Sequence, residues 1–319
     1  MQSSAGTTGL RCRKVENNPM QNILTNTTQV RTNTRLPLTQ APDLTKVHRL
    51  TENDRTEALA FLAIRPVQTV VMSSFITDNG MVSDLNRGKF FAYRNAEGKI
   101  EGIALIGHTT LVEARSDESL KGLAFLARTS ETPIHLIMSS GAEAAKFHGH
   151  LTGGATLPRL TCVEALFEAA FPFAVQNCEW NIGNADMEQL ELVAEAQAEI
   201  AFIECGVDPM QKDREGFLKR VARRIEQDRV FTVFEDGKLI FKADIIAETA
   251  ETIYLEGIYV HPDYRGRGVG STCLAEVTRR LLSRVDNICL LSNVDFAAAH
   301  RSYGKAGYTQ TDQCVTLFV

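Results

Sequence analysis

The stretch that decides the fold is Tyr254–Val277, with the sequence YLEGIYVHPDYRGRGVGSTCLAEV. Its first part predicts a β-strand over Thr252–Val260, because β-branched and aromatic side chains favour extended backbone. Pro262 ends this strand, since proline cannot donate to a sheet ladder. Further on, apolar residues recur with the 3.6-residue helical period, which predicts a helix over Ser271–Val285 with Ser271 as its cap.

A glycine-rich turn, Arg265 to Gly270, joins the predicted strand to the predicted helix. Glycine permits positive φ and lets the backbone approach a ligand closely. The start of a helix offers free N–H groups and the positive end of the helix dipole, which together favour phosphate. The turn fits neither the dinucleotide-binding pattern GxGxxG nor the P-loop, which ends in Gly-Lys-Ser/Thr. It therefore predicts a phosphate site of another kind, with a turn of no chemical role as the alternative.

Length and composition limit the possible functions. A chain of 319 residues should hold about two domains. The net charge of −5 gives no support to a nucleic-acid partner. The seven cysteines include no CxxC pair, and we find no signal peptide and no apolar run near the ~18 residues that would span a bilayer. We therefore expect a cytoplasmic protein without a membrane or nucleic-acid partner.

A metal site is not expected from the sequence. His148 and His150 stand at alternate positions, but no third ligand lies near them in the chain. The cysteines lie in apolar surroundings, where a buried small hydrophobic residue is the usual role.

The same order of elements occurs twice along the chain. Each half predicts a hairpin, a strand, a helix, another strand and an alanine-rich helix. In the first half we expect the hairpin at 90–94 with 100–106, the strand at 109–112, the helix at 117–127, the next strand at 134–138 and the last helix at 142–148. In the second half we expect the same elements, in the same order, at 230–234 with 239–246, 252–260, 271–285, 287–291 and 297–306. The order predicts two tandem copies of one α/β fold, and two unrelated α/β domains are the alternative.

Further helices are predicted outside the repeated order. Glu52–Ile64 has an apolar side, and we expect Pro66 to end this helix. Asp186 and Asp213 each precede a helix with an apolar stripe, and the first stripe includes Ile203. The second helix also carries a basic cluster, Lys219, Arg220, Arg223 and Arg224, which we interpret as a solvated face.

The predicted domains are residues 45–177 and 178–319. Residues 1–44 are rich in Thr, Asn, Gln and Ser, so we expect a disordered tail, or a start codon assigned too early with Met20 as a candidate.

The pattern Arg-x-x-Gly-x-Gly, formed by Arg265, Gly268 and Gly270, resembles that of the GNAT superfamily of acyl-CoA-dependent N-acetyltransferases. The resemblance covers about Cys178 to Val319. The first half has no glycine between Leu111 and Leu120 and resembles the degenerate GNAT-like domain of bacterial tandem acetyltransferases. The resemblance implies an α/β (α+β) fold of two tandem GNAT-like domains, each a mixed central sheet flanked by helices.

The resemblance also implies how acetyl-CoA would bind. The pyrophosphate would lie on the turn and the pantetheine arm along the strand before it, while Asn293 would supply a cofactor hydrogen bond because Phe296 stands where the family usually has asparagine. The cofactor residues expected in this way are Ile258, Tyr259, Val260, Arg265, Gly266, Arg267, Gly268, Val269, Gly270, Ser271 and Asn293.

Two residues are expected to carry the chemistry. Glu256 lies on an apolar strand, where a carboxylate costs free energy unless it is paired or used, and it is the candidate general base. A structural carboxylate paired with an arginine is the alternative for Glu256, and His261 is the alternative base. Tyr303 lies in a segment that resembles the family's Ala-x-x-x-Tyr-x-x-x-Gly-Phe and would protonate the CoA thiolate; a packed aromatic is the alternative there.

The expected reaction is transfer of an acetyl group from acetyl-CoA to a primary amine by direct attack, without a metal. The alternative is a non-catalytic acyl-CoA-binding sensor or scaffold. The sequence leaves open the acceptor amine, the acyl chain and the oligomeric state.

Overall fold

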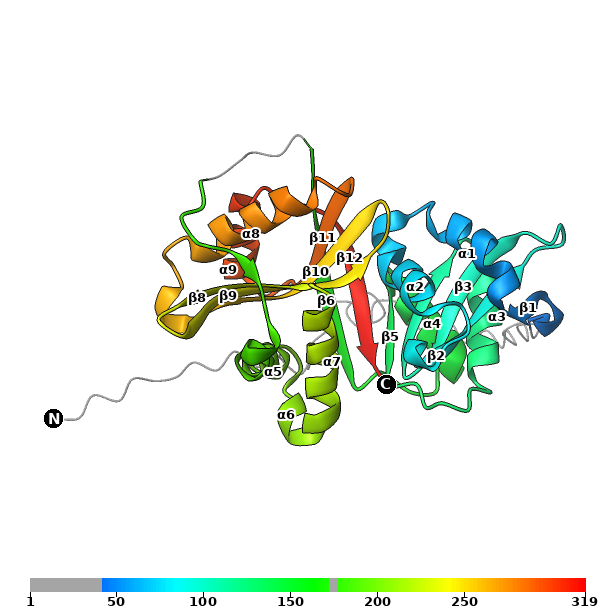
Figure 1. Cartoon of the computed structure of the whole chain (residues 1–319). Helices are drawn as coiled ribbons and strands as arrows, with labels where there is room; N and C mark the ends of the chain where they lie inside the picture. The colour runs from blue at the N-terminus through cyan, green and yellow to red at the C-terminus, as the bar shows by residue number, and fades with distance from the viewer. Residues whose placement is uncertain (1–41, 172–176) are drawn as a thin grey trace, which may run out of the picture.

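Strands from distant parts of the chain lie side by side in one mixed sheet (Figure 1). The computed structural model describes residues 42–171 and 177–319. Within these ranges the sheet has 12 strands in the order β1-β2-β3-β4-β5-β12-β6-β11-β10-β9-β8-β7, with helices on both faces. This is the predicted mixed α/β class. Most of the predicted tail, residues 1–41, lies outside the described residues, and Leu44–Lys46 forms a short 3-10 turn.

The first half contains the predicted hairpin, strand and helices. Its elements are β1 (Val47–Arg49), α1 (Arg55–Leu62), α2 (Pro66–Asn79), β2 (Gly88–Arg94), β3 (Ile100–Gly107), β4 (Thr109–Ala114), α3 (Asp117–Ala127), β5 (Leu136–Ser140), α4 (Glu143–Thr152) and β6 (Leu160–Ala170).

The second half repeats the order after two additional long helices. Its elements are β7 (Gly183–Asn184), α5 (Leu190–Cys205), α6 (Pro209–Lys212), α7 (Arg214–Glu226), β8 (Val230–Glu235), β9 (Lys238–Glu248), β10 (Thr252–Val260), α8 (Val269–Leu281), β11 (Asn287–Asn293), α9 (Ala297–Lys305) and β12 (Thr309–Phe318).

The two halves exchange their last strands. β6 belongs to the first half by sequence but pairs with β11 of the second half, from Asn287 opposite Ala170 to Asn293 opposite Glu164. β12 ends the chain but pairs with β5 of the first half. β6 and β12 also pair with each other, so they join the two halves at the centre of the sheet.

The main core of the second half lies between the sheet and helices α8 and α9. Leu274, Val277 and Leu281 of α8 are buried in one cluster with sheet residues such as Leu255 and Leu290. The apolar period that predicted α8 therefore marks the face that packs on the sheet. α5 and α7 pack together with their own buried cluster, and α5 also contacts β9 and β10.

Helix α2 was not predicted. We expected Pro66 to end a helix, but α1 ends at Leu62 and Pro66 occupies the first turn of α2, where its missing N–H costs nothing. α2 packs on the second half: Val67 and Val70 share a buried cluster with Tyr254. The first half thus covers part of the sheet of the second half.

Other local predictions also need correction. Ser271 does not cap α8: the N-cap is Gly268, with φ of 85°, and the Ser271 hydroxyl donates to the carbonyl of Gly268 at 2.9 Å. Ile203 is exposed rather than on the buried side of α5. Strand β6 at Leu160–Ala170 was not predicted from the sequence.

Candidate active site

The two parallel strands at the centre of the second half separate partway along their length. β10 and β11 are paired from Thr252 with Asn287 to Leu255 with Leu290, and no pair follows. β11 continues along β6 as far as Asn293, whereas β10 continues along β9 as far as Val260. The segment from Glu256 to Val260 therefore has no paired strand on its β11 side among the described residues.

A β-bulge lies where this separation begins. The register of β10 against β9 shifts between Glu256 and Tyr259, and Gly257 has φ of +62°. A Cβ atom at Gly257 would lie 2.4 Å from Oε1 of Gln197 and 2.7 Å from Nζ of Lys242. Only glycine fits this position, since both the backbone conformation and the neighbouring atoms exclude a side chain.

Lys242 holds the bulge from inside the protein. Its side chain is fully buried, and Nζ donates to Oδ1 of Asp244 at 2.7 Å, to Oε1 of Gln197 at 2.7 Å and to the carbonyl of Gly257 at 3.1 Å. Three acceptors for three ammonium hydrogens satisfy the buried charge. Gln197 belongs to α5, so this network ties helix, β9 and the bulge together.

Glu256 is the first residue of β10 beyond the last pair with β11. Burial raises its pKa above the ordinary glutamate value, and the charge of Asp244 acts in the same direction. Arg224, Lys242 and a hydrogen bond from Tyr254 oppose this rise. A carboxyl group with a raised pKa, next to a gap between strands, is suited to accept a proton near neutral pH.

Two further glutamates lie near Glu256 and were not singled out from the sequence. Glu164 on β6 accepts a hydrogen bond from the Thr316 hydroxyl at 2.9 Å; burial and then Glu256 raise its pKa. Glu204 on α5 has an exposed side chain. Desolvation by the surrounding protein, followed by the charges of Glu256 and Glu164, nevertheless raises its pKa to about 8. The strand 160–170 carries two glutamates, Glu164 and Glu168, so the sequence does not single out Glu164. Nothing in the sequence links the end of α5 to Glu256.

Tyr303 approaches the same region from α9. It is 9% exposed, and its ring packs edge-on against Phe167 of β6 with 5.4 Å between centroids. Burial raises its pKa to about 12, with Glu204 adding to the rise and a hydrogen bond with Ser292 opposing it. Glu204 is thus an electrostatic neighbour of both Tyr303 and Glu256, and a shared catalytic role of these two residues stays a prediction.

The glycine turn after β10 leads into α8, whose N-terminus has no side-chain cap. Gly266 and Gly268 have φ of 78° and 85°, and Gly268 has no side chain to cap α8. Thr272 donates the first hydrogen bond of the helix, to the carbonyl of Gly268 at 3.0 Å. The N–H groups of Val269, Gly270 and Ser271 precede that bond and have no intrahelical partner. They form the type of helix start that binds phosphate.

The remaining predicted cofactor residues have local contacts of their own. Arg265 donates to the carbonyl of Val260 at 2.9 Å and to Oε1 of Glu199 at 3.3 Å. Arg267 lies over the ring of Tyr264 at 5.5 Å. Oδ1 of Asn293 accepts from the N–H of Asp295 at 2.9 Å, at the turn into α9. Cofactor contacts of these three residues stay predictions.

The first half contains a counterpart of Glu256. β4 begins its pairing with β5 at Thr109, as β10 begins its pairing with β11 at Thr252, and four residues on from each start stand Glu113 and Glu256. Glu113 is buried and forms ion pairs with Arg65 at 3.2 Å and Arg115 at 2.7 Å. The arginine-paired carboxylate that we considered for Glu256 is therefore found at Glu113.

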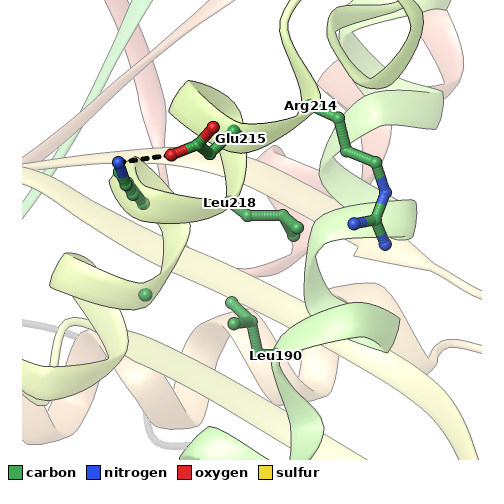
Figure 2. A pocket seen from close by; sticks show the side chains of 6 residues that line it. Leu190, Arg214, Glu215 and Leu218 are labelled. Carbon is green, nitrogen blue, oxygen red and sulfur yellow. Dashed lines mark hydrogen bonds and ion pairs between the residues drawn. The ribbon is translucent and has the colours of Figure 1, made fainter.

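A surface groove lies elsewhere on the described part of the chain. A groove of about 360 Å³ between α5 and α7 is lined by Leu190, Arg214, Glu215, Leu218, Lys219 and Ala222 (Figure 2). Lys219 bonds to Glu215 at 2.7 Å, and Arg223 bonds to Asn79 at 3.1 Å. The groove shares no residue with the surroundings of Glu256. Lys219 fits the solvated face predicted for the basic cluster. Arg224 does not fit it, because its side chain is 22% exposed and its Nε lies 3.8 Å from Oδ2 of the buried Asp244.

The described parts of the chain contain neither a cluster of metal-ligating side chains nor a helix that could cross a membrane. Over residues 42–171 and 177–319, no three His, Cys, Asp or Glu side chains are grouped so as to hold a metal ion. In the same ranges, every helix is too short or too polar to cross a membrane.

Known proteins match the chain by family and by fold. The family model for the acetyltransferase (GNAT) domain matches residues 226–310, which include β10, the glycine turn, α8 and α9. No curated protein matches the sequence.

Solved structures share the architecture at low identity. A GNAT-family acetyltransferase from Colwellia psychrerythraea has a TM-score of 0.57 at 14% identity, over 86% of this chain and 99% of its own. A Drosophila protein has a TM-score of 0.64 at 11% identity, over 86% and 98%. A tandem GNAT protein from the clavulanic acid biosynthesis pathway has a TM-score of 0.53 at 13% identity, over 86% and 97%.

These matches give the fold over most of the chain and the family over its C-terminal part. Domains of this family transfer acetyl groups from acetyl-CoA. The chain therefore carries a GNAT acetyltransferase domain at residues 226–310, within a larger α/β fold that it shares with tandem GNAT proteins.

Proposed function

We propose that the protein is an N-acetyltransferase that moves the acetyl group of acetyl-CoA to a primary amine by direct attack. The observation that carries this proposal is the end of β10–β11 pairing at Leu255 and Leu290, immediately before Glu256. The gap between β10 and β11 leaves the backbone of Glu256 to Val260 accessible to the arm of a cofactor. The Glu256 carboxylate lies at the closed end of this gap. The uncapped start of α8 follows its open end.

Acetyl-CoA would enter along β10 from the glycine turn. Its pyrophosphate would accept hydrogen bonds from the N–H groups of Val269, Gly270 and Ser271, with Arg265 and Arg267 adding positive charge. Its pantetheine arm would follow Ile258–Val260. From Glu256 to Val260 the extended backbone spans roughly 13 Å, which separates the phosphate region from the thioester region.

The acceptor amine must lose a proton before it can attack, because a lysine-like amine has a pKa of about 10.4. Glu256 would take that proton. The nitrogen lone pair then forms a bond to the thioester carbon, the C–S bond breaks, and the electron pair leaves on sulfur. The raised pKa of Glu256 brings this base closer to the working pH.

Tyr303 would stabilise the departing sulfur. With its pKa raised to about 12, the phenol is fully protonated at neutral pH and can donate its hydrogen to the thiolate. Since an ordinary thiol has a pKa of about 8.5, the phenol holds its proton more tightly than the thiol does. Tyr303 therefore acts mainly as a hydrogen-bond donor, and its contribution should be smaller than that of Glu256.

A thiol-release assay tests the proposal directly. The full chain is mixed with acetyl-CoA and a panel of primary amines: lysine peptides, polyamines, aminoglycosides and amino acids. We expect amine-dependent release of CoA, with the N-acetylated amine identified by mass spectrometry. Acetyl-CoA binding without release for any amine would favour the non-catalytic sensor instead.

A further inference from the structure

A second, partly open cavity lies under α2, at the junction of the two halves. Its volume is about 60 Å³. The apolar part of its wall includes Val67 and Val70 of α2, Met138 of β5, Leu166 of β6 and Leu291 of β11. Both halves of the chain therefore supply the lining.

Three of the polar groups in the wall are already paired. The Ser139 hydroxyl donates to the carbonyl of Val112 at 2.8 Å, Cys314 Sγ donates to the carbonyl of Ser139 at 3.3 Å, and Gln68 donates to Asp312 at 3.3 Å. These three groups therefore need no hydrogen bond from water or from a polar ligand. Such a space favours an apolar occupant.

The cavity adjoins the proposed base. Tyr254 forms part of its wall and hydrogen-bonds Glu256, two residues further along the same face of β10. Cys314 also lines the cavity and is the register partner of Glu164 on β6. Tyr254 is therefore the residue that connects the cavity with the closed end of the gap between β10 and β11.

We propose that this cavity receives the tail of the acyl group, so that the protein prefers an acyl-CoA with a short straight chain over acetyl-CoA. The inference rests on the proposed function and names its donor more closely. A cofactor arm that runs from the glycine turn along Val260 and Ile258 reaches Glu256 with its thioester. The acyl group continues in the same direction, towards Tyr254 and the cavity, whereas the acceptor must arrive from the side.

The volume sets the chain length. A dry cavity of about 150 Å³ accommodates benzene, with six carbons. By proportion, about 60 Å³ takes two or three carbons beyond the carbonyl region. The preferred group is thus about four carbons long, and chains of eight or more carbons should be excluded.

Binding measurements on the full chain test this without need of an acceptor. Dissociation constants for acetyl-, propionyl-, butyryl-, hexanoyl- and octanoyl-CoA are measured by calorimetry. We expect affinity to rise about fourfold for each methylene up to butyryl, about 15-fold in all, and to fall at octanoyl.

Three variants locate the effect. Val70→Phe fills the cavity and should remove the gain for butyryl-CoA while acetyl-CoA binds as before. Met138→Ala enlarges the cavity and should shift the optimum towards hexanoyl-CoA. Met81→Ala, a buried methionine of the first half that does not line the cavity, should leave the chain-length profile unchanged. If Val70→Phe does not fold, the wild-type series and Met138→Ala still decide.

The outcomes of these experiments distinguish a failure of this inference from a failure of the proposed function. A flat series with normal acetyl-CoA binding would overturn this inference and leave the proposed function intact. Chain-length dependence that appears in the KM of a series of alkylamines, and not in acyl-CoA binding, would overturn it in favour of an acceptor pocket. Failure of acetyl-CoA itself to bind would overturn the proposed function and this inference together.

Discussion

Glu256 is subject to opposing electrostatic effects, and their balance determines a pH profile. Burial and Asp244 raise its pKa, and Arg224 and Lys242 lower it. A base works only when ionised, so the rate should fall as the pH drops through a pKa that lies above the ordinary glutamate value. Glu256→Gln should reduce kcat by roughly 10²-fold or more and remove this acidic limb, with acetyl-CoA affinity nearly unchanged. Profiles of kcat against pH for both proteins provide the measurement; identical profiles would exclude Glu256 as the base and leave His261 or water.

Tyr303 offers a test of the leaving-group step. Tyr303→Phe keeps the ring that packs on Phe167 but removes the hydroxyl. We expect turnover to fall by roughly 10- to 100-fold, with a melting temperature close to that of the wild type. Steady-state kinetics and thermal unfolding are compared. A large loss of stability with full turnover would show that the hydroxyl, bonded to Ser292, has a structural role.

Lys242 should position Glu256 without touching the substrate. Lys242→Met keeps much of the volume but removes the donors to Gly257, Gln197 and Asp244. Breaking a buried ion pair costs about 3–5 kcal/mol, so unfolding should occur at lower temperature. Because the lysine charge also lowers the pKa of Glu256, the acidic limb of the rate profile should move to higher pH. A stability loss with an unchanged profile per folded molecule would limit Lys242 to a structural role.

Among the elements, the two helices that follow β4 and β10 begin differently. In α3 the hydroxyl of Ser116 accepts from the N–H of Ser119 at 3.2 Å, so the protein itself occupies the helix start. In α8 the N-cap is Gly268, which offers no such acceptor. Phosphate affinity should therefore be confined to α8, and one acyl-CoA should bind per chain.

A pair of matched substitutions checks this difference. Gly268→Asp adds a carboxylate where the pyrophosphate should lie, so acetyl-CoA affinity should fall at least about tenfold. Ser116→Asp adds the same charge at the start of α3, where aspartate can also cap a helix, and should leave acetyl-CoA affinity unchanged. It should lower stability somewhat, because the Ser116 hydroxyl donates to Oε2 of Glu101 at 3.1 Å and an aspartate would face that carboxylate instead. Calorimetric titration gives affinity and stoichiometry together. Two sites per chain, or equal effects of the two substitutions, would contradict the assignment.

Elements with strong local signals were predictable from the sequence. Strand β10 and the hairpins β2–β3 and β8–β9 depend on alternating apolar residues and turn glycines, and these local patterns determine local structure. Helix α2 was missed because proline has two roles: it ends one helix and begins the next. β6 was missed because its partners β11 and β12 are supplied by distant parts of the chain.

The site shows the same division between local and distant information. The glycine turn and Glu256 lie within one continuous stretch, so their association was predictable. The approach of Glu164 and Glu204, the bond from Lys242 to Gly257 and the cavity under α2 depend on how separate segments pack. No pattern within a single segment contains that information.

At the scale of the whole molecule, the exchanged strands make the halves depend on each other. The predicted boundary at residue 177 would leave the second half without β6, which pairs with both β11 and β12. A fragment of residues 178–319 should therefore be largely insoluble or unfolded, whereas a fragment of residues 155–319, which keeps β6, should be better folded. Circular dichroism and thermal unfolding compare the two fragments, and an equally stable shorter fragment would show that β6 is dispensable.

The exchange of β6 and β12 between the halves also affects how the protein folds while the ribosome synthesises it. Cys314 of β12 contacts Ser139 of β5 across a sequence separation of 175 residues. At a synthesis rate of about 5–20 residues per second, β5 is made roughly 10 to 35 s before β12, its partner in the sheet. During that time the nascent first half presents an unpaired strand edge, the kind of surface that chaperones cover and aggregates extend. Pairing over such a separation is also slow in itself, so this protein should depend on chaperones more than its length alone suggests.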